Sequence, residues 1–250
     1  MASVSAPRRR PAAKKYSFLL DTGGDQWGFR IPTSALTLAG FRDWATSDEF
    51  PERIRAAFIG QEILIEKSNE DLDTHVAVKA EISRVLMNLN REQRLGRFYP
   101  GGVLVSNEAA SLSNNPDALF FTPETFRTGR VRLVPKPDKE GRYREVEGTP
   151  DWVLEVISDS SVEKDTEKLR EAYHRAGIPE YWLIDARGDG IDFQILYHGE
   201  NGYEAAPRQK DWQQSSVFGR SFRLERQQDE LGLWEYTLHV RKVRKKGKTS

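Results

Sequence analysis

A glutamate inside an apolar run, Glu155 within residues 152–157, constrains the fold of this chain more than any other feature of its sequence. The run is apolar on both faces, which is typical of a central strand that is covered on both sides. Side chains alternate along a strand, so Glu155 shares one face with Val153 and Ile157. A charged, unpaired carboxylate in such a core costs several kcal/mol, so Glu155 is expected to meet a metal, a cation or a proton. A structural ion pair with an arginine or a lysine is the alternative to a metal site.

A second carboxylate, Asp117, opens another apolar strand and directly follows Pro116. If the two strands are neighbours, Asp117 and Glu155 can converge at one edge of a sheet. Two carboxylates and a main-chain carbonyl form the hard, oxygen-rich environment that suits Mg²⁺ or Mn²⁺. The alternative is that Asp117 is only a turn residue at the start of its strand.

Two helices are predicted around these strands. The first covers residues 70–90, where an apolar stripe has helical spacing and His75 continues the stripe at the helix start. The second begins with a serine cap, at Ser160 or Ser161, and ends near Ala176, just before a glycine and a proline. The stripe of the first helix consists of Val78, Ile82, Val85, Leu86 and Leu89.

The predicted elements follow the order helix, three strands, helix, strand. The core strands are expected at residues 98–106, 117–121, 152–157 and 181–184. A short helix over 37–45 and a hairpin with its turn at Gly60-Gln61 precede them, and a charged, exposed ribbon is expected over 127–148. A second hairpin over 191–206 and a last strand over 231–240 follow. The sequence therefore predicts an α/β fold with an αβββαβ core, a mixed central sheet, an N-terminal hairpin and extra C-terminal strands.

The second helix also carries a candidate cation, Lys168. The buried stripe of this helix consists of Leu169, Ala172, Tyr173 and Ala176. Lys168 lies four residues before Ala172, so it borders the stripe and its ammonium group could reach over the strand ends toward the carboxylates. The alternative is an ordinary surface lysine. Lys164, one turn earlier, is expected to lie beyond easy reach of the strand ends.

The lack of cysteine and the charge distribution exclude several classes of protein. No disulfide, thiolate zinc site or cysteine nucleophile can form. Residues 1–15 lack an apolar signal region, and no apolar run approaches the roughly 20 residues of a membrane span, so a cytoplasmic protein is expected.

The formal net charge is 0, but residues 1–15 carry +5 and residues 241–250 carry +6, which leaves −11 for the body between them.

The two basic ends, 1–15 and 241–250, are predicted to be disordered tails that bind polyphosphate without sequence preference. The residues expected to contact nucleic acid are Arg8, Arg9, Arg10, Lys245 and Lys246. The alternative is that both ends are only solvated. Residues 16–240 are expected to form a single domain with its core over residues 70–187.

Three stretches of the sequence carry a resemblance to a known family. They are Asn-Pro-Asp-Ala-Leu-Phe-Phe at 115–121, Thr-Pro-Asp-Trp-Val-Leu-Glu-Val-Ile-Ser at 149–158, and residues 165–185, which end in Gly-Ile-Pro-Glu-Tyr-Trp-Leu-Ile-Asp. They closely resemble the Uma-two family of restriction-endonuclease-like proteins within the PD-(D/E)XK nuclease superfamily. The resemblance covers roughly residues 41–203 and is most specific over 150–185. It implies a restriction-endonuclease-like fold and the hydrolysis of DNA phosphodiester bonds.

The resemblance also implies roles for individual residues. Asp117 and Glu155 would hold the Mg²⁺ or Mn²⁺ ion. The superfamily lysine normally stands two residues after the glutamate, where this chain has Ile157, so Lys168 would supply the amine from the helix instead. DNA is the implied partner. A twofold homodimer is also implied, because duplex cleavage needs two scissions.

The early hairpin departs from the family pattern. Ala57 and Gly60-Gln61 stand where the family often has an acidic residue and an Asp-Gly turn. Glu62 does match, and His75 matches a histidine at the start of the first helix, so both are auxiliary site candidates. The alternatives are an exposed strand glutamate for Glu62 and a capping or packing residue for His75.

Two functions from different classes follow from these observations. The first is a metal-dependent endonuclease. The second is a nuclease fold kept as a non-catalytic module that binds nucleic acid or a protein, which the altered hairpin and the acidic body favour. A glycosidase is disfavoured, because the strands are too apolar for a sugar cleft. A divalent ion on Asp117 and Glu155 would indicate the enzyme, whereas a Glu155–Lys168 ion pair without metal would indicate the module.

Overall fold

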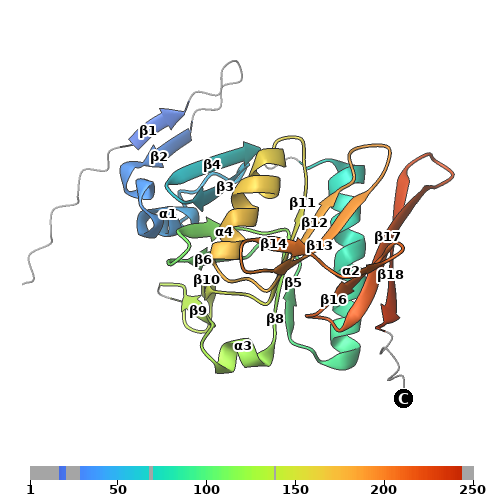
Figure 1. Ribbon diagram of the computed structural model, residues 1–250. Coiled ribbons are helices and arrows are strands. Elements are labelled where there is room, and N and C mark those ends of the chain that lie inside the picture. Colours follow the sequence, from blue (N-terminus) through green and yellow to red (C-terminus); the bar gives the residue numbers. More distant parts are fainter. Residues whose placement is uncertain (1–16, 21–28, 68–69, 138, 244–250) are drawn as a thin grey trace, which may run out of the picture.

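The computed structural model describes residues 17–20, 29–67, 70–137 and 139–243, and its centre is a mixed six-stranded sheet (Figure 1). The order of strands in this central sheet is β14-β13-β12-β11-β8-β5. β8 (Ala118–Phe121) pairs antiparallel with β5 (Arg97–Tyr99) and with β11 (Trp152–Val156), whereas β12 (Glu180–Asp185) is parallel to β11. The predicted α/β class and mixed sheet are confirmed.

Two helices cover opposite faces of the central sheet. α2 (Ala77–Gln93) packs its apolar stripe in one hydrophobic core with Leu154 of β11. α4 (Leu169–Arg175), which links the parallel strands β11 and β12, packs in the other core with Val153. Because side chains alternate along β11, Glu155 lies on the α4 face of the sheet.

A second six-stranded sheet, with the order β4-β3-β7-β6-β10-β9, carries the predicted early hairpin. The hairpin consists of β3 (Ile54–Ile59) and β4 (Glu62–Lys67), and its turn contains Gly60 with φ of 66°. The other strands are β6 (Leu104–Asn107), β7 (Leu112–Asn114), β9 (Val131–Pro135) and β10 (Tyr143–Gly148).

Two predictions about this second sheet were wrong. Residues 98–106 are not one strand, because Gly101 and Gly102 adopt φ of 88° and 72° and divide them into β5 and β6, which lie in different sheets. The ribbon over 127–148 does form a hairpin, but it is not simply exposed. β10 pairs parallel with β6, and its Glu145 is 2% exposed because Arg42 binds it at 2.9 Å.

Further elements lie at both ends of the chain. On the N-terminal side are β1 (Ser17–Leu20), β2 (Phe29–Pro32), a 3₁₀ turn (Thr33–Leu36) and the predicted short helix α1 (Leu38–Ala45). The predicted C-terminal hairpin is β13 (Asp192–His198) and β14 (Tyr203–Ala205). A four-stranded sheet follows, formed by β15 (Arg208–Gln209), β16 (Trp212–Ser215), β17 (Arg220–Gln228) and β18 (Trp234–Lys242). A short helix, α3 (Pro123–Arg127), follows β8.

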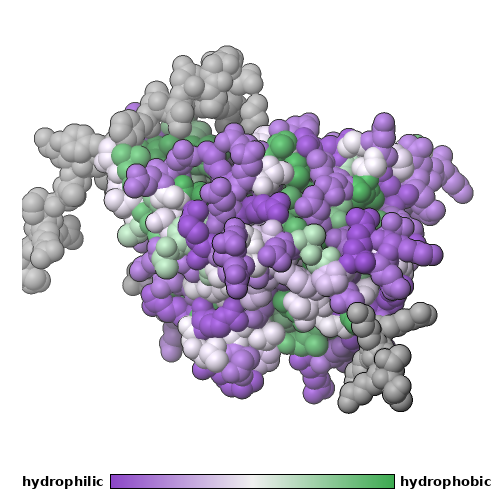
Figure 2. Space-filling view, in the orientation of Figure 1, coloured by the Kyte–Doolittle hydropathy of each residue, from purple (hydrophilic) through white to green (hydrophobic). Residues whose placement is uncertain are grey.

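The face shown in Figure 2 is mainly hydrophilic, with smaller apolar patches among the hydrophilic residues. No helix in the described part of the chain is long and apolar enough to cross a membrane. β18 ends at Lys242, so the strand includes the first two residues of the segment 241–250 that was predicted to be a tail.

Candidate active site

Asp117 lies at the junction between β8 and β11, and its backbone and side chain both bind the neighbouring strand. Its backbone N–H donates to the carbonyl of Leu154 at 3.0 Å, and its Oδ2 accepts a hydrogen bond from the N–H of Val156 at 2.8 Å. The side chain is buried. The carboxylate of Asp117 is therefore fixed at the edge of the sheet, beside the end of the strand that carries Glu155.

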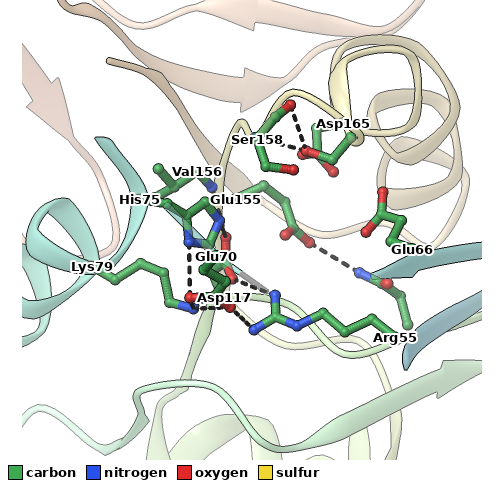
Figure 3. A network of polar contacts seen from close by, with 12 residues as sticks. Arg55, Glu66, Glu70, His75, Lys79, Asp117, Glu155, Val156, Ser158 and Asp165 are labelled. Carbon is green, nitrogen blue, oxygen red and sulfur yellow. Dashed lines mark hydrogen bonds and ion pairs between the residues drawn. The ribbon is translucent and has the colours of Figure 1, made fainter. Parts of the chain in front are cut away.

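A cluster of charged side chains surrounds Asp117 on the α2 side (Figure 3). Lys79 Nζ lies 3.0 Å from Asp117 Oδ1 and 3.0 Å from Glu70, and Arg55 contacts both carboxylates from β3. His75 bridges the same two groups, with Nε2 3.3 Å from Asp117 and Nδ1 3.0 Å from Glu70. Burial alone would raise the pKa of Asp117, but the hydrogen bond from His75 and the charges of Lys79 and His75 hold it below its usual value. Asp117 is therefore an ionised group that can bind a cation.

Glu155 is buried on the α4 face and forms no direct ion pair within the described residues. Its Oε1 accepts hydrogen bonds from the Tyr173 hydroxyl and from Asn114 Nδ2, the latter at 3.0 Å. Burial, followed by the charges of Asp165 and Asp117, raises the pKa of Glu155 well above its usual value. A positive charge placed between these carboxyls would relieve their repulsion.

Lys164 provides a positive charge on this side of the site. Its Nζ lies 2.8 Å from Glu66 Oε2 and 3.3 Å from Asp165 Oδ1, and its side chain is only 13% exposed. Burial alone would lower its pKa, but the charges of Asp165, Glu155 and Glu66 raise it above the usual value for lysine. Burial also raises the pKa of Asp165 to about 6, although Lys164 opposes this shift. The expectation that Lys164 lies out of reach was therefore wrong.

The structure brings together only some of the residues that the sequence singled out. Asp117, Glu155 and His75 lie in one connected region. Figure 3 shows Glu155 between the cluster around Asp117 and the two acidic residues Glu66 and Asp165. Lys168 is not among them, because its Nζ lies 2.5 Å from Glu62 and 3.4 Å from Glu163, and both partners are exposed. The tail residues Arg8, Arg9, Arg10, Lys245 and Lys246 lie outside the described residues.

The donor atoms at this site fit a hard divalent cation. Within the described residues, single ligand atoms of Glu70, His75 and Asp117 all lie within 4.8 Å of one another. On the other side of Glu155, the buried carboxylate oxygen Glu66 Oε1 accepts no hydrogen bond from any described group, and Asp165 Oδ1 accepts none either but lies 3.3 Å from Lys164 Nζ in an ion pair. Carboxylate oxygens that lack donors are the ligands that Mg²⁺ and Mn²⁺ prefer.

Several residues of the site were not identified from the sequence. Lys79 could have been, because it lies four residues after His75 on the same helix face. Glu70 and Arg55 have no such signal, since Glu70 precedes the helix and Arg55 comes from the second sheet. Asn114 is the last residue of β7, a strand that the sequence did not predict.

The chain is similar to known proteins in sequence and in fold. A family model named Uma2, described as "Putative restriction endonuclease", matches residues 38–227. A crystal structure described as "a putative nuclease belonging to DUF820" from Anabaena variabilis is similar in fold, with a TM-score of 0.52 and 18% sequence identity. The alignment covers 73% of this chain and 90% of that one. A comparison with curated proteins gave no significant match.

Proposed function

The chain belongs to the Uma2 family, and on this premise we propose that it is a metal-dependent endonuclease that hydrolyses phosphodiester bonds of DNA. The observation that carries the proposal is the convergence of Asp117 and Glu155 at one sheet edge, within a buried group of acids and cations. The nuclease description of the family supports the same reaction class.

Asp117 and Glu155 would hold the divalent ion, with Glu70 and His75 next to Asp117 as further donors. When bound, such an ion polarises a phosphate oxygen and lowers the pKa of a water molecule. His75 and Lys79 keep Asp117 ionised, Arg55 contacts it from β3, and Tyr173 and Asn114 orient Glu155.

We assign the catalytic amine to Lys164 and not to Lys168. Hydrolysis forms a bond from a water oxygen to phosphorus, breaks the ester P–O bond and places extra negative charge on the phosphoryl oxygens. Lys164 is charged, because its pKa lies above the usual value, so it cannot remove a proton but can stabilise that charge. Lys168 already pairs with Glu62 and Glu163 at the surface, which removes both Lys168 and Glu62 from the proposed catalytic set.

DNA as the substrate and a homodimer as the active assembly belong to the same proposal. The acidic body makes a broad DNA-binding surface unfavourable, so the basic residues at the ends of the chain would supply sequence-independent affinity. Pairing of two identical subunits would provide one site for each strand of a duplex.

A nicking assay on supercoiled plasmid with Mn²⁺ tests the proposal. Asp117→Asn, Glu155→Gln and Lys164→Met should each abolish cleavage, whereas Lys168→Met should cleave like the wild type. Mn²⁺ should also raise the melting temperature of the wild type, since a ligand that binds only the folded state stabilises it, and Asp117→Asn should lose this rise. Equal cleavage by the Asp117→Asn variant and the wild type would contradict the site assignment.

A non-catalytic nuclease-fold module is the second candidate function. The observation in its favour is that cations and the Val156 N–H already engage both oxygens of Asp117. A wild-type protein that binds DNA, shows no thermal response to Mn²⁺ and does not nick plasmid would support this alternative.

A further inference from the structure

A large cavity lies at the end of α2 that is remote from the candidate active site. Lys79 lies in the first turn of this helix and His75 in the turn before it, whereas the cavity is lined by residues around the C-terminal end of α2, by β5, by α3 and by the β9–β10 hairpin. Its volume is about 1000 Å³. At about 1.5 Å per residue, the 17 residues of α2 separate the two places by roughly 25 Å.

Three arginines on the rim of the cavity, Arg91, Arg94 and Arg97, have no partner among the described residues. All three are exposed and form neither an ion pair nor a side-chain hydrogen bond, although Glu92 lies between them in the sequence. A fourth, Arg127, pairs with Glu124. Arginines elsewhere on the surface are commonly paired, as Arg130 is with Asp151 and Arg132 with Glu147. The rim therefore offers free guanidinium groups for an anion.

The backbone that carries these arginines is held in place. The Asn90 side chain donates to the carbonyl of Gly96 at 3.2 Å and accepts from its N–H at 2.9 Å, which closes the turn after the helix. Gly96 also packs so closely against β8 that a Cβ atom there would lie 2.1 Å from the carbonyl oxygen of Phe121. The backbone from which the arginine side chains extend is therefore preorganised, which lowers part of the entropic cost of binding.

The floor and wall of the cavity are aromatic. The buried ring of Phe121 contacts the partly exposed rings of Tyr99 and Phe126, with centroid distances of 5.6 and 5.2 Å. Tyr143, on β10, is 52% exposed at the wall. Figure 2 shows apolar surface between the positions of α3 and the end of α2, with hydrophilic surface around it. Flat apolar rings beside free guanidinium groups match a ligand that has both a planar ring and an anionic group.

We propose that this cavity binds a nucleotide, with its base against the aromatic wall and its phosphate on Arg91, Arg94 and Arg97. Guanidinium groups bind phosphate oxygens through paired hydrogen bonds, and bases stack on aromatic side chains in unpaired nucleic acid. A free nucleotide and an unpaired end of a strand share this chemistry. The proposal does not depend on nuclease activity, since the cavity contains none of the proposed catalytic residues.

Calorimetric titration of the full chain in EDTA tests the proposal with four probes: adenosine monophosphate, a ten-residue oligothymidylate, inorganic pyrophosphate and an oligoglutamate peptide. Arg91→Gln/Arg97→Gln should weaken nucleotide binding at least tenfold, because two charge-assisted contacts are lost. The matched control Arg175→Gln/Arg208→Gln, which removes two exposed arginines outside the cavity, should bind like the wild type. All four arginines are exposed, so both variants should keep the wild-type melting temperature.

Tyr143→Ala separates stacking from simple charge attraction. It should weaken binding of the nucleotide roughly fivefold or more and leave pyrophosphate binding unchanged. Binding of the monophosphate supports a free nucleotide as the ligand, and binding of the oligonucleotide alone supports a strand end. The proposal is overturned if neither nucleotide probe binds at millimolar concentration, or if the cavity variant binds like the control. Tighter binding of an oligoglutamate peptide than of either nucleotide probe would also overturn it.

Discussion

Replacing Lys164 by methionine should destabilise the protein by about 3–5 kcal/mol at pH 7, a large share of the roughly 5–15 kcal/mol that keeps a domain folded. Methionine keeps an apolar stem of similar shape but removes the ammonium group, which lies 2.8 Å from Glu66 and 3.3 Å from Asp165. These two carboxyls and Glu155 would then share a buried space without the cation that offsets their repulsion. The cost arises from uncompensated buried charge, and not from lost packing.

The dependence of this loss on pH follows from the direction of the pKa shifts. The acidic neighbours of Lys164 raise its pKa in the folded state. Its contribution to the free energy of unfolding is therefore fully present below its pKa in the unfolded state, and it is lost only as pH rises through its higher pKa in the folded state. Both values lie well above neutrality, so the wild-type contribution is constant near pH 7. In the variant, Glu155 and Asp165, whose pKa values are already raised by burial, can reduce the repulsion by binding protons. The stability difference should therefore shrink as pH falls from about 7 toward 4.

Urea denaturation of the wild type, Lys164→Met and Lys168→Met at pH 7 and pH 5 measures these differences. The slope of unfolding free energy against urea should be the same in all three, because the surface exposed on unfolding does not change. Lys168→Met should be nearly silent, since its ammonium group lies at the surface between Glu62 and Glu163. The reasoning is refuted if both variants lose equally little stability, or if the Lys164→Met loss is the same at both pH values.

Three further predictions concern other parts of the molecule. Glu180→Ala should lower the free energy of unfolding by about 3 kcal/mol in a denaturant titration, because Trp182, Ser215, Ser216 and Val217 all donate to this buried carboxyl, and Glu180→Gln should cost less. Removing residues 1–15 and 244–250 should flatten the salt dependence of DNA binding measured by fluorescence anisotropy, and an unchanged slope would argue against a role for these ends. Sedimentation velocity at micromolar concentration should give the mass of a dimer, and a monomer mass would contradict the proposed assembly.

The parts of the fold that the sequence predicted are those that local pattern specifies. The apolar residues on both faces of β11 place it centrally, and the stripes of α2 and α4 define which face of each helix packs on the sheet. The second sheet was missed because it depends on pairing between distant segments, such as Val105 of β6 with Val146 of β10. Short strands such as β7 also carry too few residues to show a period.

The sequence likewise predicted only some residues of the candidate site. Asp117 and Glu155 were identified because a carboxylate in or beside an apolar strand requires a partner whatever the rest of the fold is. Of the residues around Asp117, His75 was identified, but Arg55 and Glu70 were not, because they come from the early hairpin and from the segment that follows it. A buried charge indicates that a partner exists, but the tertiary structure determines which residue it is.

The choice between Lys164 and Lys168 depends on one local departure from α-helical geometry. The helix that precedes β12 begins with a π-helical turn over Lys164–Lys168, in which the N–H of Leu169 bonds to the carbonyl of Lys164. Such a turn contains one extra residue, which rotates the preceding side chains by about 100° relative to a regular helix. An unbroken α-helix that buries Leu169 would also bury Val162, yet Val162 is 38% exposed and Ser161 is 3% exposed. The same shift turns Lys164 inward, so an argument from 3.6-residue periodicity does not identify it as the neighbour of Glu66 and Asp165. A second π-helical turn, over Leu72–Val76, carries His75 beside Asp117. Both irregular turns thus place polar side chains at the same site, and regular helices at these positions would direct those side chains elsewhere.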